Sequence, residues 1–332
     1  MQELQITMLG PSGVGKTTLL TAMYEQFESN IGLTNLQLTP DDDSAAILQD
    51  RLVELKSLID VFEARGRTGI QGTEALAGPE SLRAFRFGLG KKGEAPSLQL
   101  CFRDYPGKYH ETSATSEEKQ FVKELLQNSV AVLIAIDAPA LMEDPKGVLH
   151  EKINRPQQIK NLFNAAFQDL DSPRLVIFAP VKCEKYLKDD KSASELIDRV
   201  KKGYENLFNH FNSEKLSPLI VSAITPIQTV GSVVFSRIEF DSQNNPHFYF
   251  RKIRHDAYYN PKDSEQLLRY LLRFLLKLHL DSRNRSWGFF SFVRGWLSLD
   301  DYLRKAVDEF ARGCKTTGGF VVIKGEQLLN IY

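Results

Sequence analysis

The sequence predicts an α/β fold with a mostly parallel, doubly wound sheet, and two observations carry this prediction. Short runs rich in Val, Ile and Leu alternate along the chain with longer segments of helical periodicity. This alternation is typical of strand–helix–strand units, which place their strands in parallel and their helices on both faces of the sheet. The first apolar run is also followed at once by a glycine-rich loop and a helical segment, which is the order of elements in such a unit.

A strand is expected at residues 4–9 and a helix at 18–27, on either side of the glycine-rich loop. A further helix is expected at 41–65, because three aspartates open it and carboxylates stabilise a helix N-terminus. The apolar residues of this helix recur every three or four positions. Such a stripe packs either against the same domain or against a partner helix, and the sequence leaves both interpretations open.

Alternating apolar residues at 82–89, a turn with two glycines and two lysines, and an apolar run at 98–102 predict a two-stranded hairpin. Three later runs are expected to be buried strands, each preceded by a helical segment. The strands are expected at 130–136, 175–179 and 219–222, and the helices at 117–127, 156–170 and 192–211. Two strand-like stretches follow at 232–240 and 247–253, and an amphipathic helix is expected at 264–279.

The chain of 332 residues, with 42% hydrophobic and 25% charged residues, has the size and composition of a globular protein with one large domain and an appendage. We expect a main domain at 1–280, with a helical insertion at 41–65 and a β-rich insertion at 224–261. Residues 281–332 are expected to form a C-terminal α/β accessory unit, with a helix at 298–312 and a short strand at 320–323.

The three cysteines are far apart and form no CxxC pair, which favours a reducing compartment. The N-terminus has neither the basic nor the long apolar region of a signal peptide. The longest apolar run, at 130–136, is far too short to span a membrane. The cytoplasm is therefore the expected location.

Charge is balanced over the chain, with 42 basic and 42 acidic residues, but residues 251–332 carry 15 basic against 9 acidic ones. This excess is either solvated surface or a docking face for an acidic partner or a membrane surface. The aromatic-rich segment 287–297 leaves a similar choice between core packing and docking. Residues 281–332 and the helix at 41–65 are the candidate contacts for an effector or regulatory protein. No recognition motif supports a nucleic-acid partner.

The strongest motif is the loop from Gly10 to Thr17, which matches GxxxxGK[ST] at every fixed position. In such a loop, backbone N–H groups surround a β-phosphate, the lysine adds positive charge at the β- and γ-phosphates, and the hydroxyl binds Mg²⁺. The sequence therefore predicts a site for a nucleoside triphosphate and Mg²⁺. The residues expected to contact them are Gly10, Ser12, Gly13, Val14, Gly15, Lys16, Thr17 and Thr18.

A carboxylate is expected beside this loop, because the second hairpin strand runs directly into Asp104 and continues as a DxxG step to Gly107. Asp104 is expected to hold the magnesium through water, and the Gly107 N–H to sense the γ-phosphate. Thr73 is expected to complete the metal shell when the triphosphate is bound, and Thr68 is the alternative.

The residue that follows the DxxG glycine is Lys108, and His110 comes two positions later. Lys108 takes the place where many enzymes of this chemistry carry a glutamine that orients the attacking water. His110 is either a substitute for that glutamine, as a neutral imidazole can orient water, or an exposed loop residue.

Two further groups of candidate binding residues lie at the ends of later strands. Lys182 and Glu184 follow the strand at 175–179, and Ser222, Ala223 and Ile224 lie at the end of the next strand. With these motifs, residues 2–280 resemble the translation-factor class (TRAFAC) of P-loop GTPases, which have the Ras-like architecture. That family recognises guanine with an [NT]KxD box at one strand end and an SA[KL]-type box at the next. The resemblance therefore implies that these five residues surround a guanine base and that the cofactors are GTP or GDP and Mg²⁺.

Two positions depart from the family pattern. Val181 replaces the Asn or Thr, and Glu184 replaces the Asp whose carboxylate accepts from both guanine donors, N1–H and N2–H₂. Glutamate keeps the negative charge and the two carboxylate oxygens of aspartate, and its side chain is one methylene longer. The long insertions and the step from Asp104 to Gly107 are similar to those of the double-GTPase group of bacterial conflict systems.

The function predicted from these residues is a GTP-binding molecular switch that hydrolyses GTP slowly with Mg²⁺ and controls a partner protein. Slow hydrolysis is expected because Lys108 can donate hydrogen bonds but cannot accept one from the attacking water. Two alternatives stay open: a nucleotide-binding interaction module with little hydrolysis, and a P-loop ATPase or kinase.

Overall fold

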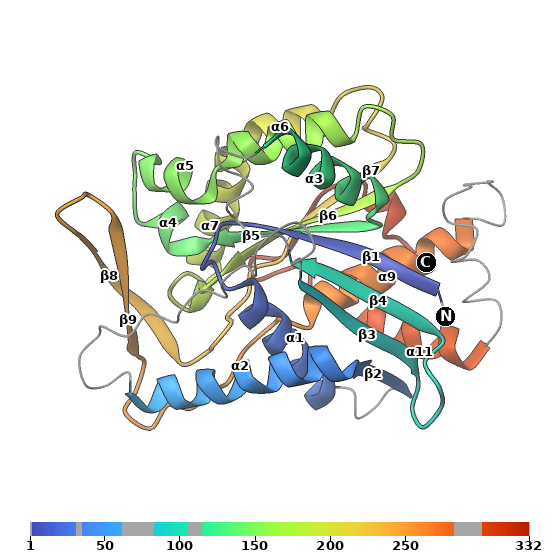
Figure 1. Ribbon diagram of the computed structural model, residues 1–332, viewed down its shortest axis with the longest axis horizontal. Helices are drawn as coiled ribbons and strands as arrows, with labels where there is room; N and C mark the ends of the chain where they lie inside the picture. Colours follow the sequence, from blue (N-terminus) through green and yellow to red (C-terminus); the bar gives the residue numbers. More distant parts are fainter. Residues whose placement is uncertain (1, 31–34, 62–82, 105–114, 282–300, 332) are drawn as a thin grey trace.

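The computed structural model describes residues 2–30, 35–61, 83–104, 115–281 and 301–331. Within these ranges the central sheet has eight strands in the order β10-β7-β6-β5-β1-β4-β3-β2 (Figure 1). The neighbouring strands β7, β6, β5, β1 and β4 run parallel, whereas β3, β2 and β10 are joined by antiparallel pairing. The strands are β1 (Gln2–Leu9), β2 (Leu36–Pro40), β3 (Arg83–Lys91), β4 (Leu98–Asp104), β5 (Ala131–Asp137), β6 (Arg174–Val181), β7 (Ile220–Ile224) and β10 (Val321–Lys324).

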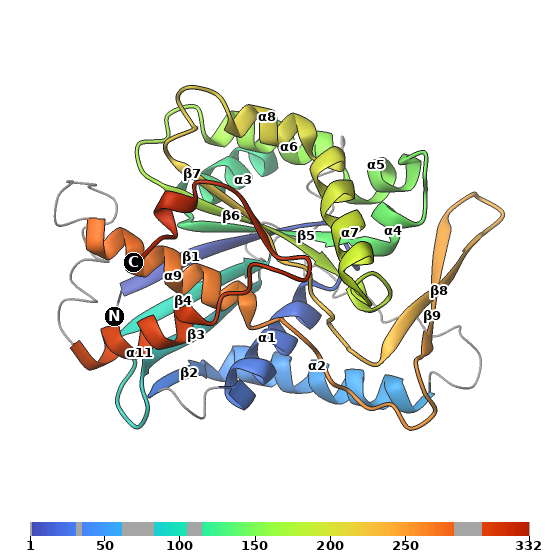
Figure 2. The same ribbon diagram turned by 180° about the vertical axis from the view of Figure 1, so that it is seen from behind.

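Helices cover both faces of this sheet, as Figures 1 and 2 show from opposite sides. One face packs against α1 (Lys16–Asn30), α9 (Gln266–Asp281) and α11 (Asp301–Arg312). The other packs against α3 (Ser116–Asn128), α4 (Ala138–Met142), α6 (Pro156–Ala166), α7 (Asp190–Gly203) and α8 (Glu205–Phe211). Helix α2 (Asp42–Val61) lies against α1, and the short α5 (Val148–Asn154) leads into α6. The sheet is therefore doubly wound, as predicted.

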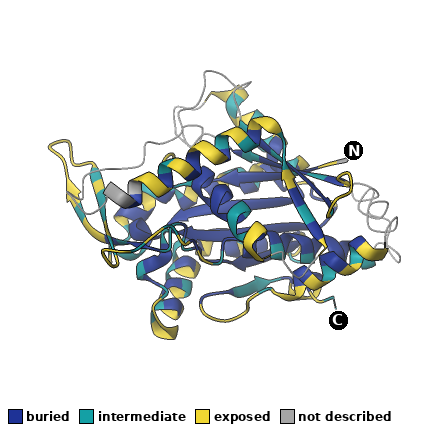
Figure 3. Cartoon of the chain, turned by 90° about the horizontal axis from the view of Figure 1, so that it is seen from below, coloured by how far each residue is buried: buried dark blue, intermediate teal, exposed yellow. Residues whose placement is uncertain are grey.

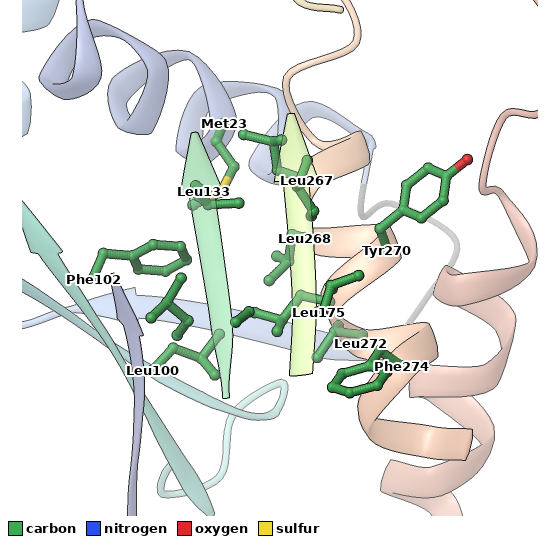
Figure 4. Close-up of a cluster of buried hydrophobic side chains, with 14 of the residues drawn as sticks. Met23, Leu100, Phe102, Leu133, Leu175, Leu267, Leu268, Tyr270, Leu272 and Phe274 are labelled. Atoms are coloured by element: carbon green, nitrogen blue, oxygen red, sulfur yellow. The ribbon is translucent and has the colours of Figure 1, made fainter. Parts of the chain in front are cut away.

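The core lies in the two layers between the sheet and its helices. Every residue of β5 and β6 is buried, which explains why these strands are continuous apolar runs rather than alternating ones. Figure 4 shows Phe102, Leu133 and Leu175 of three strands beside Met23 of α1 and Leu268 of α9. Exposed residues gather on the outer faces of the helices and on the extended hairpin (Figure 3). No helix within the described ranges is both long and apolar enough to cross a membrane.

The predicted insertion after β7 forms an antiparallel hairpin of β8 (Val233–Phe240) and β9 (Pro246–Lys252). Among the described residues these two strands pair only with each other, and the hairpin extends away from the central sheet (Figure 1). A 3-10 turn, η4 (Cys183–Lys185), follows β6 and contacts β8. The hairpin thus joins the body of the protein beside the carboxyl end of β6.

Some predicted elements differ from the structure. The helix expected at 192–211 is divided into α7 and α8 next to Gly203, a residue with low helix propensity. Strand β2 and helices α4 and α5 have no counterpart among the predicted elements, since each is short.

The C-terminal residues from Asp301 onward belong to the main sheet and its core. Strand β10 pairs with β7, and Val307, Phe310 and Phe320 are buried in the same cluster as the residues of α1 and α9. The helix and strand expected within 281–332 are therefore present as α11 and β10, but they complete the main domain instead of forming a unit of their own. The aromatic segment 287–297 lies outside the described residues.

Replacing Phe310 with leucine is expected to lower the free energy of unfolding by about 1 to 2 kcal/mol. The Phe310 ring is 1% exposed, lies edge-on to Phe27 at 5.2 Å and carries the Arg269 guanidinium 4.2 Å from its centroid. Leucine keeps most of the apolar volume but loses both ring contacts. Chemical denaturation measures the change, with Tyr258→Leu as the control because that ring is 71% exposed. Equal effects of the two substitutions would contradict the placement of α11 in the core.

Candidate nucleotide site

The loop between β1 and α1 has a backbone that requires glycine at three positions. Gly10, Gly13 and Gly15 have φ angles of 148°, 74° and 106°, which side-chain-bearing residues rarely adopt. A Cβ on Gly10 would lie 2.7 Å from the Ala135 carbonyl oxygen, so the loop begins in close contact with β5. Helix α1 begins at Lys16, and the N–H groups of its first turn favour an anion.

Lys16, Thr17 and Asp104 form a buried polar cluster beneath this loop. The Lys16 Nζ donates to the Gly10 carbonyl at 3.2 Å and lies 3.6 Å from Asp104 Oδ1. The Thr17 hydroxyl donates to Asp104 Oδ2 at 3.5 Å. Register explains the approach, because Asp104 is paired with Met8 of β1, two residues before Gly10. The structure thus brings together the predicted phosphate-binding lysine and both described candidate metal ligands.

The Asp104 carboxyl fits a magnesium site. Its side chain is 9% exposed, and among the described residues Oδ1 has no hydrogen-bond partner. Burial raises the pKa of Asp104, and the Lys16 ammonium opposes that rise. Mg²⁺ prefers oxygen ligands and usually takes one or two from the protein, with phosphate and water oxygens supplying the rest. The Thr17 hydroxyl supplies such a ligand, and the Asp104 carboxylate can accept a hydrogen bond from a water on the metal.

A second polar cluster lies at the carboxyl ends of β5 and β6. Lys182, whose φ of 61° turns the chain out of β6, donates from Nζ to Asp137 Oδ2 at 2.6 Å. The Glu184 Oε1 accepts hydrogen bonds from the backbone N–H groups of Val230 at 2.9 Å and Gly231 at 3.0 Å. Burial raises the pKa of Glu184, and these N–H groups oppose the rise.

Asp137 belongs to this candidate site through its contact with Lys182, and the sequence interpretation missed it. It ends β5, is 4% exposed and caps the N-terminus of α4 by accepting from the Ala140 N–H. Asn154 fixes its backbone by accepting from the Asp137 N–H at 2.8 Å and donating to the Asp137 carbonyl at 3.2 Å. The available signal was an aspartate directly after a buried strand, the same signal that identified Asp104.

Ser222, Ala223 and Ile224 are the last three residues of β7 and end before the level of Lys182 and Glu184. All three are buried within β7, which is paired with β6 on one side and β10 on the other. The pairing with β6 continues past the strand, because the Ile227 N–H donates to the Pro180 carbonyl. The segment level with Lys182 and Glu184 is therefore 228–231, and the backbone groups of Ser222–Ile224 belong to the sheet.

Five other candidate residues cannot be placed relative to these clusters. Thr73, its alternative Thr68, Gly107, Lys108 and His110 lie outside the described residues. The described part of the site comprises the Lys16–Thr17–Asp104 cluster on one side and the Asp137–Lys182–Glu184 cluster on the other. Both follow the carboxyl ends of strands in the same parallel sheet, where ligands of α/β proteins bind.

A buried histidine beneath Asp137 gives a prediction of pH dependence. Asn154 donates to His150 Nδ1 at 3.0 Å, so the proton is on Nε2, which faces the Gly203 carbonyl at 3.4 Å. Burial lowers the pKa of His150 below its ordinary 6.5. The unfolded chain then binds more protons, so the free energy of unfolding should fall as the pH decreases through 6.5.

This prediction is checked by denaturation at pH 7.5 and at lower values on the wild type and on His150→Gln. The pKa of His210 is also lowered by burial, so some pH dependence should persist in the variant. A pH profile that is unchanged by His150→Gln would contradict the prediction.

Two solved structures are similar to this chain at low sequence identity. No protein-family model and no curated protein matches the sequence. The GTPase-like domain of S. cerevisiae Ski7 bound to GTP is similar at 12% identity and a TM-score of 0.40, over 68% of this chain and 43% of that one. The same domain bound to GDP and inorganic phosphate is similar at 14% identity and a TM-score of 0.37, over 86% and 51%. This chain thus spans about half of the chains that it matches.

Proposed function

We propose that this protein binds GTP with Mg²⁺, hydrolyses it slowly and acts as a switch for a partner protein. The observation that supports this most directly is the cluster of Lys16, Thr17 and Asp104 beneath the glycine-rich loop. The Lys16 ammonium and the first turn of α1 would neutralise the phosphates, and Thr17 and Asp104 would hold the metal. When bound, Mg²⁺ supplies positive charge to the β- and γ-phosphate oxygens.

Preference for guanine is proposed from the second cluster. Glu184 presents a carboxylate, an acceptor-only group that matches the two donors on the edge of guanine. Adenine offers one donor and one acceptor on the corresponding edge, so a carboxylate discriminates against it. Lys182, held by Asp137, lies beside Glu184 and would pack along the base or ribose.

The proposed rate of hydrolysis follows from Lys108, which has no acceptor for the proton of the attacking water. We expect the unassisted turnover to lie near the scale of Ras alone, roughly 10⁻⁴ to 10⁻³ per second. The proposed contacts for the partner are the exposed face of α2, where Val53 is 54% exposed, and residues 281–332.

The deciding experiment is a competition among GTP, ATP and CTP for the purified protein, with Mg²⁺ and with EDTA. We expect GTP to bind most tightly and EDTA to weaken that binding. Equal binding of ATP would favour the ATPase alternative, and binding without measurable hydrolysis would favour the interaction module. The absence of binding to any triphosphate would contradict the proposal.

A further inference from the structure

Each of the three charged residues around η4 contacts the β8–β9 hairpin or the segment that precedes it. The Lys182 Nζ lies 5.8 Å from the centroid of the Phe250 ring of β9, and the Lys185 Nζ lies 4.9 Å from that of Phe235 in β8. Glu184 accepts from the N–H groups of Val230 and Gly231, which precede β8. Lys182 and Glu184, which are proposed to face the base, thus also contact the hairpin or the segment that precedes it.

The segment that Glu184 binds is itself well defined, and we call residues 228–232 the hairpin stem. It pairs with the chain that returns from β9: the Asn260 N–H donates to the Val230 carbonyl at 3.0 Å, and the Ile253 N–H to the Ser232 carbonyl at 2.9 Å. A Cβ on Gly231, whose φ is 76°, would overlap the Asn260 carbonyl oxygen. Because the hairpin stem is hydrogen-bonded to the chain that returns from β9, a displacement of Val230 and Gly231 would move the hairpin with them.

The Glu184 carboxylate cannot accept all of the hydrogen bonds from the stem and from a guanine base at the same time. Its Oε1 already accepts two hydrogen bonds, which use both lone pairs of that oxygen. The N1–H and N2–H₂ donors of guanine are side by side and require both oxygens of one carboxylate. The side chain is 8% exposed, so water cannot readily replace a bond that is lost.

We propose that a guanine base and the hairpin stem compete for the Glu184 carboxylate, so that GTP or GDP releases the stem and frees the β8–β9 hairpin. This inference rests on the proposed function. GTP and GDP carry the same base, so the hairpin responds to an occupied site and not to the γ-phosphate. Thermodynamic linkage makes this effect reciprocal. A partner that binds the released hairpin tightens guanine nucleotide binding by the same factor by which the nucleotide tightens binding of the partner.

The test is hydrogen–deuterium exchange of the full chain, read at peptides that cover residues 228–253, without nucleotide and with saturating GDP, GTP or ADP. Calorimetry on the same samples measures binding. We expect GDP and GTP to speed exchange at Val230 and Gly231 roughly tenfold, the scale of a lost hydrogen bond to a charged acceptor. ADP should leave it unchanged.

Two variants distinguish loss of the contact between Glu184 and the stem from a general increase in hydrogen exchange. Glu184→Gln should exchange faster at the stem already without nucleotide, and GDP should add no further change. The matched control is Glu143→Gln, because Glu143 accepts from Lys185 and Tyr186 nearby but does not bind the stem. In this control the response to GDP should match the wild type.

Three results would overturn the inference. If GDP binds and exchange at the stem stays the same or slows, competition for Glu184 is excluded while the proposed function stands. If bound ADP speeds exchange as much as GDP, the base edge is not what displaces the stem. If calorimetry detects no nucleotide binding at all, the proposed function and this inference fail together.

Discussion

Lys16→Ala is expected to weaken the binding of GTP by about 100-fold to 1,000-fold, the scale of removing one partner from a buried ion pair. The lysine is 8% exposed and directs its ammonium toward the loop carbonyls and Asp104. Without it the phosphates meet an uncompensated carboxylate, so the loss combines a missing attraction with a new repulsion. A titration with fluorescent GTP in the presence of Mg²⁺ measures the affinity.

The control for this substitution is Lys146→Ala, which removes the same charge from an exposed loop and should leave the affinity unchanged. Lys16→Met keeps the apolar stem without the charge and should lose as much affinity as alanine does. Thermal unfolding of each variant separates loss of binding from loss of fold. A folded Lys16→Ala protein with wild-type affinity would refute the assignment of the phosphate site.

Asp104→Asn is expected to lower the turnover by about 100-fold or more and to abolish its dependence on Mg²⁺. Asparagine has the same shape and can still accept from the Thr17 hydroxyl, so the geometry is preserved while the negative charge beside the metal is lost. Burial already raises the pKa of Asp104, so a neutral residue is well tolerated by the fold.

The measurement is phosphate release as a function of MgCl₂ concentration. Asp50→Asn, on the exposed side of α2, removes one charge at a distance and should behave as the wild type. If Asp104→Asn keeps the wild-type response to Mg²⁺, another residue holds the metal.

The sequence was most informative where function and local structure depend on consecutive residues. The loop from Gly10 to Thr17 could be recognised because its glycines, lysine and threonine act together within one turn. Asp104 could be recognised because it ends a strand. Asp137 also ends a strand but belongs to no short motif, and its importance depends on Lys182, which is 45 residues away.

The Ser222–Ile224 segment shows where sequence patterns are no longer sufficient to locate a binding residue. A Ser-Ala pair near the end of an apolar run fits a base-binding box, yet the pairing with β6 extends to Ile227 and keeps Ser222 inside the sheet. The position of a strand end is set by its partner strands, which a single segment does not reveal. For the same reason, the run that includes Val321 could be predicted as a strand but not assigned to the main sheet.

The pairing of β10 with β7 has a consequence for how the protein can be shortened. Strand β7 lies about a hundred residues before β10, and without β10 its backbone N–H and C=O groups on that side would be unpaired. An open strand edge next to the apolar strand β6 is a template for pairing with other chains. Fragments that end before Val321 should therefore self-associate through β7 even when their nucleotide site is intact, and β10 acts as the cover that keeps the folded chain from doing so.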